Sequence, residues 1–407
     1  MKKIAIDARM YGKGFGLARY VESLVHGLQS AQGGRGHYSH QLALKTSYGD
    51  TPSVYGGEIH KTESEFSYTL YLKPEEVKNY RNNGGRFEVI EAPFHWYGWE
   101  EQTSFLSLLN KGSHDLVHFP HWNVPIGYRR PYIVTIHDLI MFHFPRYEAT
   151  TRSAPVFWLK DKVHRFVVKH AAHRAVEIMT TSEFTKRDIV EHIPVREEKI
   201  SVTYQAPYHD TKSVQDWKIV QSKLQMEKPY VLYVGAAYPH KNLKRLIEAW
   251  GMIASNVPDH ELVLVGTKSV WYEKLEAHIQ DLQIPRIRLL GFVEDHDLTE
   301  LYRHAAVVVF PSLYEGFGLP ALEAMSMGAP VLASCTSSLP EVLGEAAYYI
   351  DPLDASQIAY GLERVLLDHD MQIELKAKGR EQVQLFSPLV FIKKTLSVYE
   401  KAFQNKS

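Results

Sequence analysis

Residues 306–328 read AVVVFPSLYEGFGLPALEAMSMG, and this stretch decides the fold class. Its first five residues are apolar and mostly β-branched, which is typical of a strand buried on both faces of a parallel sheet. A glycine-rich turn follows, Pro320 suits the first turn of a helix, and Gly328 suits the end of that helix. The order of strand, turn and helix predicts a βαβ unit of an α/β protein.

The same order of elements recurs along the whole chain. The strands predicted in the first half are Lys3–Ile6, Phe87–Ile90, Asp115–Phe119, Tyr132–Ile136 and Ile178–Thr181. Those predicted in the second half are Tyr230–Val234, Glu261–Val265, Ile287–Leu290, Ala306–Phe310 and Pro330–Ala333. We therefore expect two α/β domains, each built around a parallel sheet.

The chain has 407 residues, which fits two or three domains. A further strand candidate, Ile200–Tyr204, precedes a polar stretch, so we place the boundary within 205–225. Residues 1–205 then form the first domain and residues 206–386 the second. The stretch 40–110 is the least regular part, and we expect long loops with a few short elements there.

The last helix is predicted over 387–407. Ser387 suits the N-cap and Pro388 the first helical position. The apolar residues that follow recur every three or four positions, as on one face of a helix, at Ile392, Leu396, Tyr399 and Phe403. This face needs a surface to pack on, and either domain could provide it.

The composition excludes several classes of protein. The chain has 46 Lys and Arg against 47 Asp and Glu, so its net charge of −1 argues against a surface that grips nucleic acid. The single cysteine, Cys335, excludes an intrachain disulfide and a thiolate zinc site. The apolar run after Met1-Lys2-Lys3 stops at Asp7, too early for a signal peptide, and no apolar run is long enough to span a bilayer. We expect a cytoplasmic protein.

One stretch, 152–174, combines six cations with interleaved apolar residues and only one acid, Asp161. A basic amphipathic helix of this kind can touch an anionic membrane, which predicts peripheral contact at the inner face of the membrane. The alternative is an ordinary solvated helix face.

Glu315 and Glu323 lie eight positions apart on either side of the start of the predicted helix. Backbone N–H groups at a helix start form an anion site, and a carboxylate can accept hydrogen bonds from two hydroxyls. Together these groups suit a ligand with both phosphate and hydroxyls, such as a nucleotide sugar. The alternative is that Glu315 caps the turn and Glu323 pairs with a surface lysine.

A second turn, after Gly235, carries Lys241 directly before Asn242, which is expected to be the N-cap of a helix. A point cation beside helix N–H groups suits a diphosphate, although a solvated lysine before an ordinary helix is equally possible. The N-terminal turn contains Gly12, Gly14 and Gly16, but its spacing does not match a dinucleotide fingerprint.

Three histidines, His118, His121 and His137, lie at or just after the C-terminal ends of predicted strands. Ligands of open α/β sheets bind at that edge. His118 and His121 could ligate a metal, but no third ligand stands at a suitable spacing, so we expect no metal site.

Taken in order, these segments resemble the retaining glycosyltransferases of family 4, the glycogen-synthase and mannosyltransferase-like group with the GT-B fold. The resemblance covers nearly the whole chain and is strongest over 230–354. The segments that carry it include Ile6–Arg9, Gly16–Tyr20, Thr135–Asp138, Thr181–Glu183, Tyr233–Gly235, Lys241-Asn242, Leu290–Val293, Glu315-x7-Glu323 and Gly328–Val331. It implies two Rossmann-like domains with parallel sheets facing across a cleft, and a C-terminal helix, 387–407, that packs back on the first domain.

The resemblance also implies roles for matching residues. The catalytic residues would be His137, Lys241 and Glu315, with His137 touching the transferred sugar. Lys241 would bind the diphosphate, Glu315 the donor sugar and Glu323 the ribose hydroxyls. The remaining donor-binding residues would be Gly16, Gly235, Phe292, Val293, Phe317, Gly318 and Leu319.

Two residues depart from the family pattern. Ala236 stands where an arginine often provides a second diphosphate cation, for which Arg245 and Arg19 are candidate substitutes. Ala18 stands where a second glycine is common, which narrows the approach to the phosphate.

The activity implied is the metal-independent, retaining transfer of a hexose or deoxyhexose, with mannose or rhamnose favoured. The donor would be a nucleotide sugar and needs no further cofactor, and the acceptor would be a glycan or a lipid-linked saccharide read by the first domain. Two alternatives stay open at this point: a nucleotide-sugar epimerase of the same architecture and a non-catalytic nucleotide-sugar binder.

Overall fold

The computed structural model describes residues 1–12, 16–33, 65–145, 154–207 and 215–405, so part of the irregular stretch 40–110 lies outside the described residues. The chain divides into two compact units. The first comprises Met1–Leu139, Arg152–Ala206 and Phe386–Ser407, and the second comprises Ile140–Thr151 and Pro207–Leu385. No sequence signal predicts that Ile140–Thr151 groups with the second unit.

The strands described in the first unit form one parallel sheet in the order β3-β2-β1-β4-β5-β6-β7. Ile4 pairs with Tyr68 on one side and with Leu116 on the other, so the N-terminal strand is central. This position explains why Ile4, Ala5 and Ile6 are completely buried. The strands are β1 (Lys2–Asp7), β2 (Phe66–Leu72), β3 (Phe87–Glu91), β4 (Leu116–Phe119), β5 (Tyr132–Ile136), β6 (Glu177–Thr180) and β7 (Ile200–Val202).

Helices cover this sheet and continue from its strand ends. The described α-helices of the first unit are α1 (Leu17–Ala31), α3 (Pro74–Val77), α4 (Leu106–Lys111), α6 (Ala154–Arg174), α7 (Glu183–His192) and α16 (Pro388–Gln404). A π-helical turn over Glu101–Phe105 precedes α4, and a 3-10 turn over Glu197–Lys199 precedes β7.

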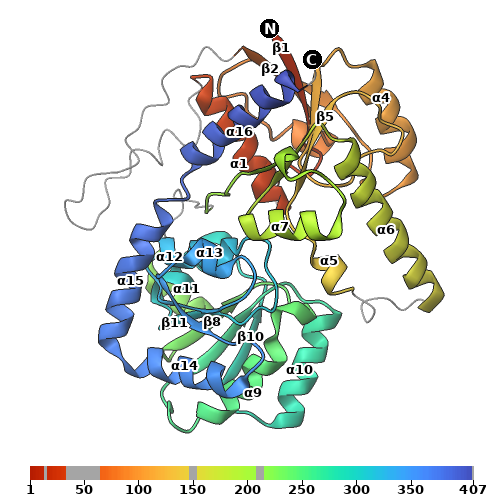
Figure 1. Cartoon of the computed structure of the whole chain (residues 1–407). Coiled ribbons are helices and arrows are strands. Elements are labelled where there is room, and N and C mark those ends of the chain that lie inside the picture. The colour runs from red at the N-terminus through yellow and green to blue at the C-terminus, as the bar shows by residue number, and fades with distance from the viewer. Residues whose placement is uncertain (13–15, 34–64, 146–153, 208–214, 406–407) are drawn as a thin grey trace. The chain divides into compact units, whose positions relative to one another are not determined.

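The C-terminal helix α16 begins where the sequence predicts it, with the side chain of Ser387 accepting a hydrogen bond from the backbone N–H of Val390. It lies beside α1 in the first unit (Figure 1). Gly27 of α1 permits this close approach, because a Cβ there would collide with the side chain of Ile392. Tyr399 is also buried in the core of this unit, so α16 contributes to its stability.

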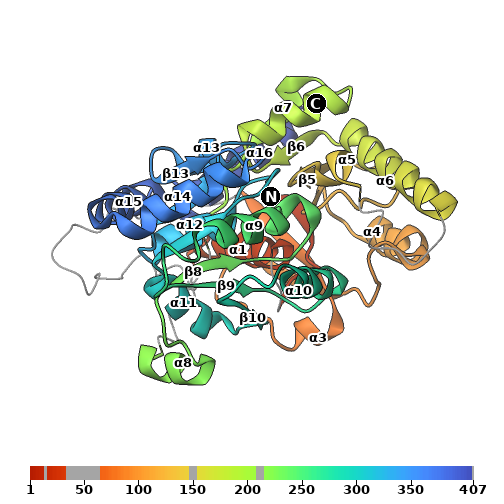
Figure 2. The same cartoon turned by 90° about the horizontal axis from the view of Figure 1, so that it is seen from below.

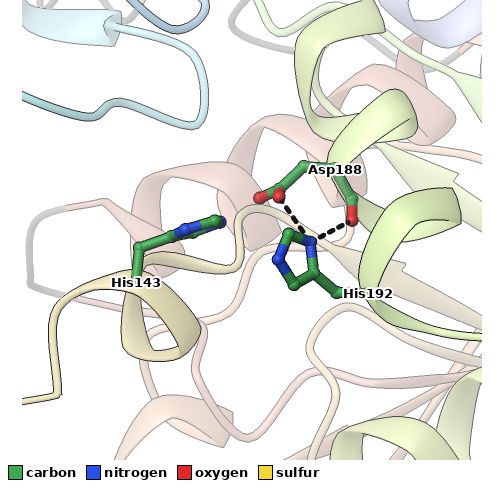
Figure 3. A group of neighbouring side chains, drawn as sticks. All are labelled: His143, Asp188 and His192. Atoms are coloured by element: carbon green, nitrogen blue, oxygen red, sulfur yellow. Dashed lines mark hydrogen bonds and ion pairs between the residues drawn. The ribbon is translucent and has the colours of Figure 1, made fainter.

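The segment Thr181-Ser182-Glu183 forms the start of α7. The side chain of Ser182 accepts a hydrogen bond of 3.0 Å from the backbone N–H of Thr185, which is an N-cap. At the other end of the helix, Nδ1 of His192 lies 3.0 Å from a carboxylate oxygen of Asp188, one turn earlier (Figure 3). Both ends of α7 are therefore fixed by its own side chains.

The second unit contains a parallel sheet in the order β10-β9-β8-β11-β12-β13, of which β8, β9 and β10 are seen side by side in Figure 2. The strands are β8 (Tyr230–Val234), β9 (Glu261–Val265), β10 (Ile287–Gly291), β11 (Val307–Phe310), β12 (Val331–Ser334) and β13 (Ala347–Ile350). The described α-helices are α5 (Ile140–His143), α8 (Trp217–Leu224), α9 (Leu243–Ile253), α10 (Val270–Leu282), α11 (Asp295–His304), α12 (Leu319–Ser326), α13 (Leu339–Leu343), α14 (Ala355–Leu367) and α15 (His369–Val383).

The core of the second unit lies where α9 and α14 pack on this sheet. One face of α9 is buried and consists of Leu243, Leu246, Ile247 and Trp250. Trp250 is fully buried, and its indole N–H donates to the carbonyl of Pro285 at 3.1 Å. The large ring can therefore be buried without an unpaired donor.

The prediction of two α/β units with parallel sheets is confirmed. Two strands, β2 and β13, were not predicted. The alternation of apolar and small polar residues in β2 is typical of a strand, but its position in an irregular stretch obscures the signal. Among the described residues, no helix has the length and apolar composition needed to cross a membrane.

Candidate active site

The most direct contact between predicted site residues joins Lys241 and Glu315. Lys241 closes a 3-10 turn over Pro239–Lys241 that follows β8, and Glu315 lies in the loop between β11 and α12. The ammonium group of Lys241 donates to both carboxylate oxygens of Glu315, at 2.6 and 2.8 Å. The carboxyl ends of two adjacent parallel strands thus bring together a cation and an anion that are far apart in sequence.

The loop that carries Glu315 is fixed by two serines. The backbone N–H of Glu315 donates to the hydroxyl of Ser337 at 2.9 Å, and the hydroxyl of Ser338 donates to the Glu315 carbonyl at 2.9 Å. Ser337 has a φ of 57°, a left-handed conformation that is unusual for serine. Neither Ser337 nor Ser338 is among the site residues that the sequence predicts.

Glu315 is ionised in this environment. Its burial by itself raises the pKa of the carboxyl, but the nearby charges of Lys241 and His240 and the hydrogen bonds more than offset that effect, so the pKa lies below its usual value. The carboxylate therefore acts as a hydrogen-bond acceptor near neutral pH, and not as an acid.

The start of α12 matches the prediction closely. Gly318 is the N-cap with a φ of 99°, Leu319 is the first helical residue, and the helix begins one residue before the predicted Pro320. Phe317 and Glu323 are buried, and Glu323 lies just over one turn into the helix. The positive φ favours glycine at position 318, because other residues are strained there.

Asn242 occupies the predicted position before α9, but the prediction that its side chain caps the helix is wrong. The residue is left-handed, with a φ of 63°, and makes no side-chain cap bond. Its amide instead donates to the carbonyls of Pro311 and Pro352, at 3.0 and 2.7 Å. Asn242 therefore ties the Lys241 turn to two neighbouring loops.

The Arg245 guanidinium is engaged in hydrogen bonds to neighbouring groups of the protein. It donates to the side-chain oxygen of Asn242 and to the carbonyl of Pro352, both at 3.0 Å. This geometry argues against Arg245 as the substitute for the arginine that Ala236 replaces.

Two tyrosines, which the sequence did not single out, fix the turn after β8. The hydroxyl of Tyr272 donates to the carbonyl of Gly235 at 2.8 Å, and that of Tyr233 donates to the carbonyl of Ala236 at 2.9 Å. Gly235 has a φ of 150°, and a Cβ on Gly266 would collide with the Gly235 carbonyl. The two tyrosine side chains thus position the turn through its backbone carbonyls.

A pocket of about 750 Å³, partly open to solvent, lies over this turn. Its lining brings together four predicted residues, Gly235, Lys241, Glu315 and Gly318. Phe317, Leu319 and Glu323 are adjacent in the chain but are not part of this lining. After β10, Phe292 is 52% exposed whereas Val293 is buried.

In the first unit, His137 follows β5 directly. Its Nε2 lies 2.8 Å from the carbonyl of Pro120, which can only accept, so Nε2 carries the proton. The amide nitrogen of Gln205 lies 3.1 Å from Nδ1 and donates to it. Burial lowers the pKa of His137 to about 4, opposed by the bond to Pro120, so the ring is neutral near pH 7.

His118 does not fit a metal site. Its Nδ1 lies 2.8 Å from the hydroxyl of Tyr399 and its Nε2 lies 2.8 Å from the hydroxyl of Thr135, so both nitrogens are engaged. Burial lowers the pKa of His118 to about 3, with a smaller contribution from His137. His118 connects β4 to α16 as a structural residue.

Gly16 is the N-cap of α1, with a φ of 61°, and none of the described atoms lies within 4 Å of where a Cβ would stand. Lys13, Gly14 and Phe15 of the same turn lie outside the described residues. Arg19 lies on the first turn of α1 and already has an interaction partner.

Family models match both parts of the chain. The model "Glycosyl transferases group 1" matches residues 215–382, and "Glycosyl transferase 4-like domain" matches residues 15–204. The chain is 31% identical to O-antigen chain mannosyltransferase B of Escherichia coli over 291 residues, which cover 70% of this chain and 74% of that protein. The chain belongs to the group 1, family 4 glycosyltransferases.

Two further similarities describe this glycosyltransferase. It is 26% identical to O-antigen chain mannosyltransferase RfbU of Salmonella typhimurium, over 79% of this chain and 84% of that protein. A sucrose-phosphate synthase from Thermosynechococcus elongatus has the same fold, with a TM-score of 0.71, 19% identity, and coverage of 99% of this chain and 100% of that one. The glycosyltransferase therefore has the GT-B fold and belongs to a retaining family, as the sequence predicts.

Proposed function

We propose that this glycosyltransferase moves a hexose or deoxyhexose from a nucleotide-diphosphate sugar to a glycan or a lipid-linked saccharide, without a metal. Mannose is the sugar favoured by the O-antigen mannosyltransferases that it resembles, and rhamnose is the second candidate. The single observation that carries the proposal is the Lys241–Glu315 pair, which lies in a pocket at the carboxyl edge of a parallel sheet.

Each half of this pair suits one part of the donor. Lys241 binds the diphosphate, and Glu315 accepts hydrogen bonds from the donor sugar. Because the two side chains satisfy each other in the free enzyme, a bound donor has to exchange one set of contacts for another of similar strength. A ligand that carries both an anion and hydroxyls can make this exchange, because the anion replaces Glu315 at Lys241 and a hydroxyl replaces Lys241 at Glu315.

Further donor contacts come from residues around the pocket. Glu323, one turn into α12, binds the ribose hydroxyls. The backbone N–H groups at the start of α12 face the phosphate and sugar, and the turn at Gly235 approaches the diphosphate. Phe292 and Val293 lie against the base, with the exposed Phe292 ring providing the surface.

The reaction builds negative charge on the diphosphate as the sugar leaves with positive charge. Lys241 and the N-terminal ends of α9 and α12 stabilise that negative charge in place. His137, neutral and fixed by Pro120 and Gln205, contacts the transferred sugar, and Gly16 approaches the diphosphate. Retention follows from same-face attack, in which the departing phosphate oxygen accepts the proton of the acceptor hydroxyl.

The first unit binds the acceptor and also contacts the membrane. Trp158, Leu159, Val163 and Phe166 on α6 are each more than half exposed, and lysines lie beside them at 160, 162 and 169. Apolar side chains flanked by cations suit the surface of an anionic bilayer. Such contact would bring the enzyme to a lipid-linked acceptor.

The test is release of nucleoside diphosphate from UDP-, GDP- and dTDP-sugars, with and without a lipid and glycan extract. Release from one donor, stimulated by the extract, supports the proposal. Glu323→Ala should weaken donor binding about tenfold to a hundredfold, because it removes a charged hydrogen-bond acceptor. Conversion of the donor with no acceptor present would instead indicate an epimerase, and unchanged donor affinity in Glu323→Ala would refute the assigned site.

A further inference from the structure

The first unit contains a connected group of buried polar side chains that the donor site does not use. Arg9 is 1% exposed and follows β1, and Glu101 is 2% exposed and opens the π-helical turn before α4. Arg9 donates to both carboxylate oxygens of Asp7 and to Glu101, each at 2.7 Å. The group continues through Asn123 to His121, whose ring lies at the carboxyl edge of the sheet.

Burial raises the pKa of Glu101, opposed by Arg9 and Asn123, but every hydrogen-bond partner that the structure gives this carboxyl is a donor, so both of its oxygens act as acceptors. Its Oε1 accepts from Arg9 at 2.7 Å and from the amide of Asn123 at 2.8 Å, and its Oε2 accepts from the backbone N–H of Tyr97 at 3.1 Å. Since the amide NH2 of Asn123 faces this carboxylate, its oxygen faces His121.

The orientation of Asn123 decides where His121 carries its proton. The oxygen of Asn123 lies 2.9 Å from Nδ1 of His121 and can only accept, so Nδ1 donates to it, and the hydroxyl of Tyr97 lies 3.2 Å from the same nitrogen. Burial lowers the pKa of His121 to about 3, with His137 contributing, so the ring is neutral and Nε2 carries a lone pair. Within the described residues, Nε2 of His121 makes no hydrogen bond.

The backbone around this group is strained. Tyr97 has a φ of 65°, a left-handed conformation that is rare for an aromatic residue, and it is held there by its bond to Glu101. Glu101 itself lies in a π-helical turn, a feature that often marks a functional site. Strain of this kind persists where the surroundings enforce it, and it clusters at binding sites.

The strained conformation exposes aromatic surface beside His121. Tyr97 is 56% exposed, its ring lies 5.2 Å from that of Trp122, and the Trp122 ring lies 4.6 Å from that of His121. The rings of His121 and His137 are nearly parallel, with centroids 6.3 Å apart. A small pocket at this edge is lined by His121, Asn123 and Trp96, among others.

We propose that His121, Tyr97 and Trp122 bind the acceptor saccharide, with Nε2 of His121 accepting a hydrogen bond from one of its hydroxyls. The two aromatic rings cover the apolar face of the sugar, and the Arg9–Glu101–Asn123 group keeps Nε2 free of a proton. Sites for small polar ligands commonly combine aromatic surface with a few fixed polar groups. This inference rests on the proposed function, because it assumes a saccharide acceptor.

A metal is the main competing ligand for a free imidazole nitrogen. Among the described residues, no cluster of three metal-ligating side chains includes His121. His137, the nearest histidine with a ring contact, has both nitrogens engaged by Pro120 and Gln205. The surroundings of His121 therefore suit a hydroxyl donor better than a cation.

The test uses the full chain with His121→Asn and His121→Gln. Asparagine keeps a donor near Nδ1 but removes the Nε2 acceptor, whereas glutamine places an oxygen near Nε2. The acceptor probes are octyl α-mannoside, octyl α-glucoside and octyl β-galactoside, and the donor is the one that wild type turns over. We expect His121→Asn to raise the acceptor KM about tenfold. In His121→Gln the acceptor KM should stay close to that of wild type. The donor Kd should stay unchanged in both variants.

The controls separate this inference from the proposed function. His369→Asn, on the exposed start of α15, should leave every parameter unchanged. An unchanged acceptor KM in His121→Asn would overturn the inference. An equal rise of the acceptor KM in both variants, accompanied by a lower melting temperature, would also overturn it. If wild type turns over no donor, the proposed function fails, and binding of the octyl glycosides by saturation-transfer NMR still decides the inference. Binding that His121→Asn abolishes would support it, and absence of binding to wild type would overturn it.

Discussion

Lys241 and Glu315 are 74 positions apart in the sequence, yet the ammonium group of one contacts both carboxylate oxygens of the other. Both side chains are largely buried, with 19% and 11% exposure. Removing one partner of such a pair leaves a charge that is poorly hydrated, whereas removing both does not. The pair can therefore be tested for stability and for catalysis separately.

Lys241→Met should abolish most donor turnover and reduce the free energy of unfolding by about 2–3 kcal/mol, because the Glu315 carboxylate loses its partner. The double variant Lys241→Met, Glu315→Gln should regain at least half of that stability without regaining activity. Urea unfolding and nucleoside diphosphate release measure the two effects. If the double variant recovered turnover, Lys241 would have no role in binding the diphosphate.

The same pair predicts a pH dependence. The pKa of Glu315 in the folded chain lies below its usual value of 4.5, so the pair stabilises the fold above that value and loses its effect as the pH falls through the folded pKa. The stability difference between wild type and Lys241→Met should therefore be constant from pH 8 to pH 6 and shrink below about pH 4.5. Urea midpoints across this range measure it. A difference that disappears already at pH 6 would show that Glu315 titrates much higher.

The turn at Gly235 depends on space that Gly266 provides. Gly266→Ala should displace the Gly235 carbonyl and the Tyr272 hydroxyl, lowering stability by about 1–3 kcal/mol and donor affinity at least tenfold. Gly98→Ala is the matched control, because no atom of the described part of the chain lies within 4 Å of the added Cβ. Calorimetric titration with the donor measures affinity. Equal donor affinities in the two variants would separate this turn from the donor site.

Much of this site follows from the sequence because it rests on local signals. Glycine at 318, proline at 320 and the eight-residue spacing of Glu315 and Glu323 are set within a single strand–turn–helix unit. The position of Lys241 is also local, since it follows the end of a strand. Those signals predict the fold class and the turns whose residues Gly235, Lys241, Glu315 and Gly318 line one pocket, whereas the donor roles proposed for these residues come from the family resemblance.

What the sequence did not predict depends on contacts between distant segments. Tyr272 reaches the Gly235 carbonyl from a helix 37 positions away, and Glu101 reaches Arg9 across 92 positions. The Asn242 side chain bonds to Pro311 and Pro352 instead of capping its own helix, because the tertiary structure supplies two carbonyls within reach. No local pattern encodes such pairs.

The α6 surface predicts binding to anionic membranes. Leu159→Gln combined with Phe166→Gln should reduce co-sedimentation with vesicles containing 30% phosphatidylglycerol at least tenfold, because it removes two exposed apolar side chains and leaves the cations in place. Leu353→Gln combined with Ile373→Gln, which changes exposed apolar residues of the second unit, is the matched control. Equal binding to pure phosphatidylcholine, or an equal loss in the control, would rule out a membrane role specific to α6.

His118 should make the first unit sensitive to acid. Its pKa in the folded chain is lowered to about 3 by burial, from a usual value of 6.5. As the pH falls from 6.5 toward 3, the unfolded chain binds a proton that the folded chain does not, so stability is lost across this window. At pH 5 the loss reaches about 2 kcal/mol, since each pH unit below 6.5 contributes about 1.4 kcal/mol.

Two variants separate this titration from the hydrogen bonds of His118. His118→Asn should lower the free energy of unfolding at pH 8. Between pH 6 and pH 4 it should also reduce the slope of that free energy against pH, by the amount that corresponds to about one bound proton. Tyr399→Phe removes one bond to His118 at about 1 kcal/mol but keeps the titrating ring, so its pH dependence should match that of wild type. Urea unfolding at pH 8, 6, 5 and 4 gives the slopes. A wild-type slope retained in His118→Asn would assign the acid sensitivity to other groups, of which His114 is the first to test because burial lowers its pKa to about 4.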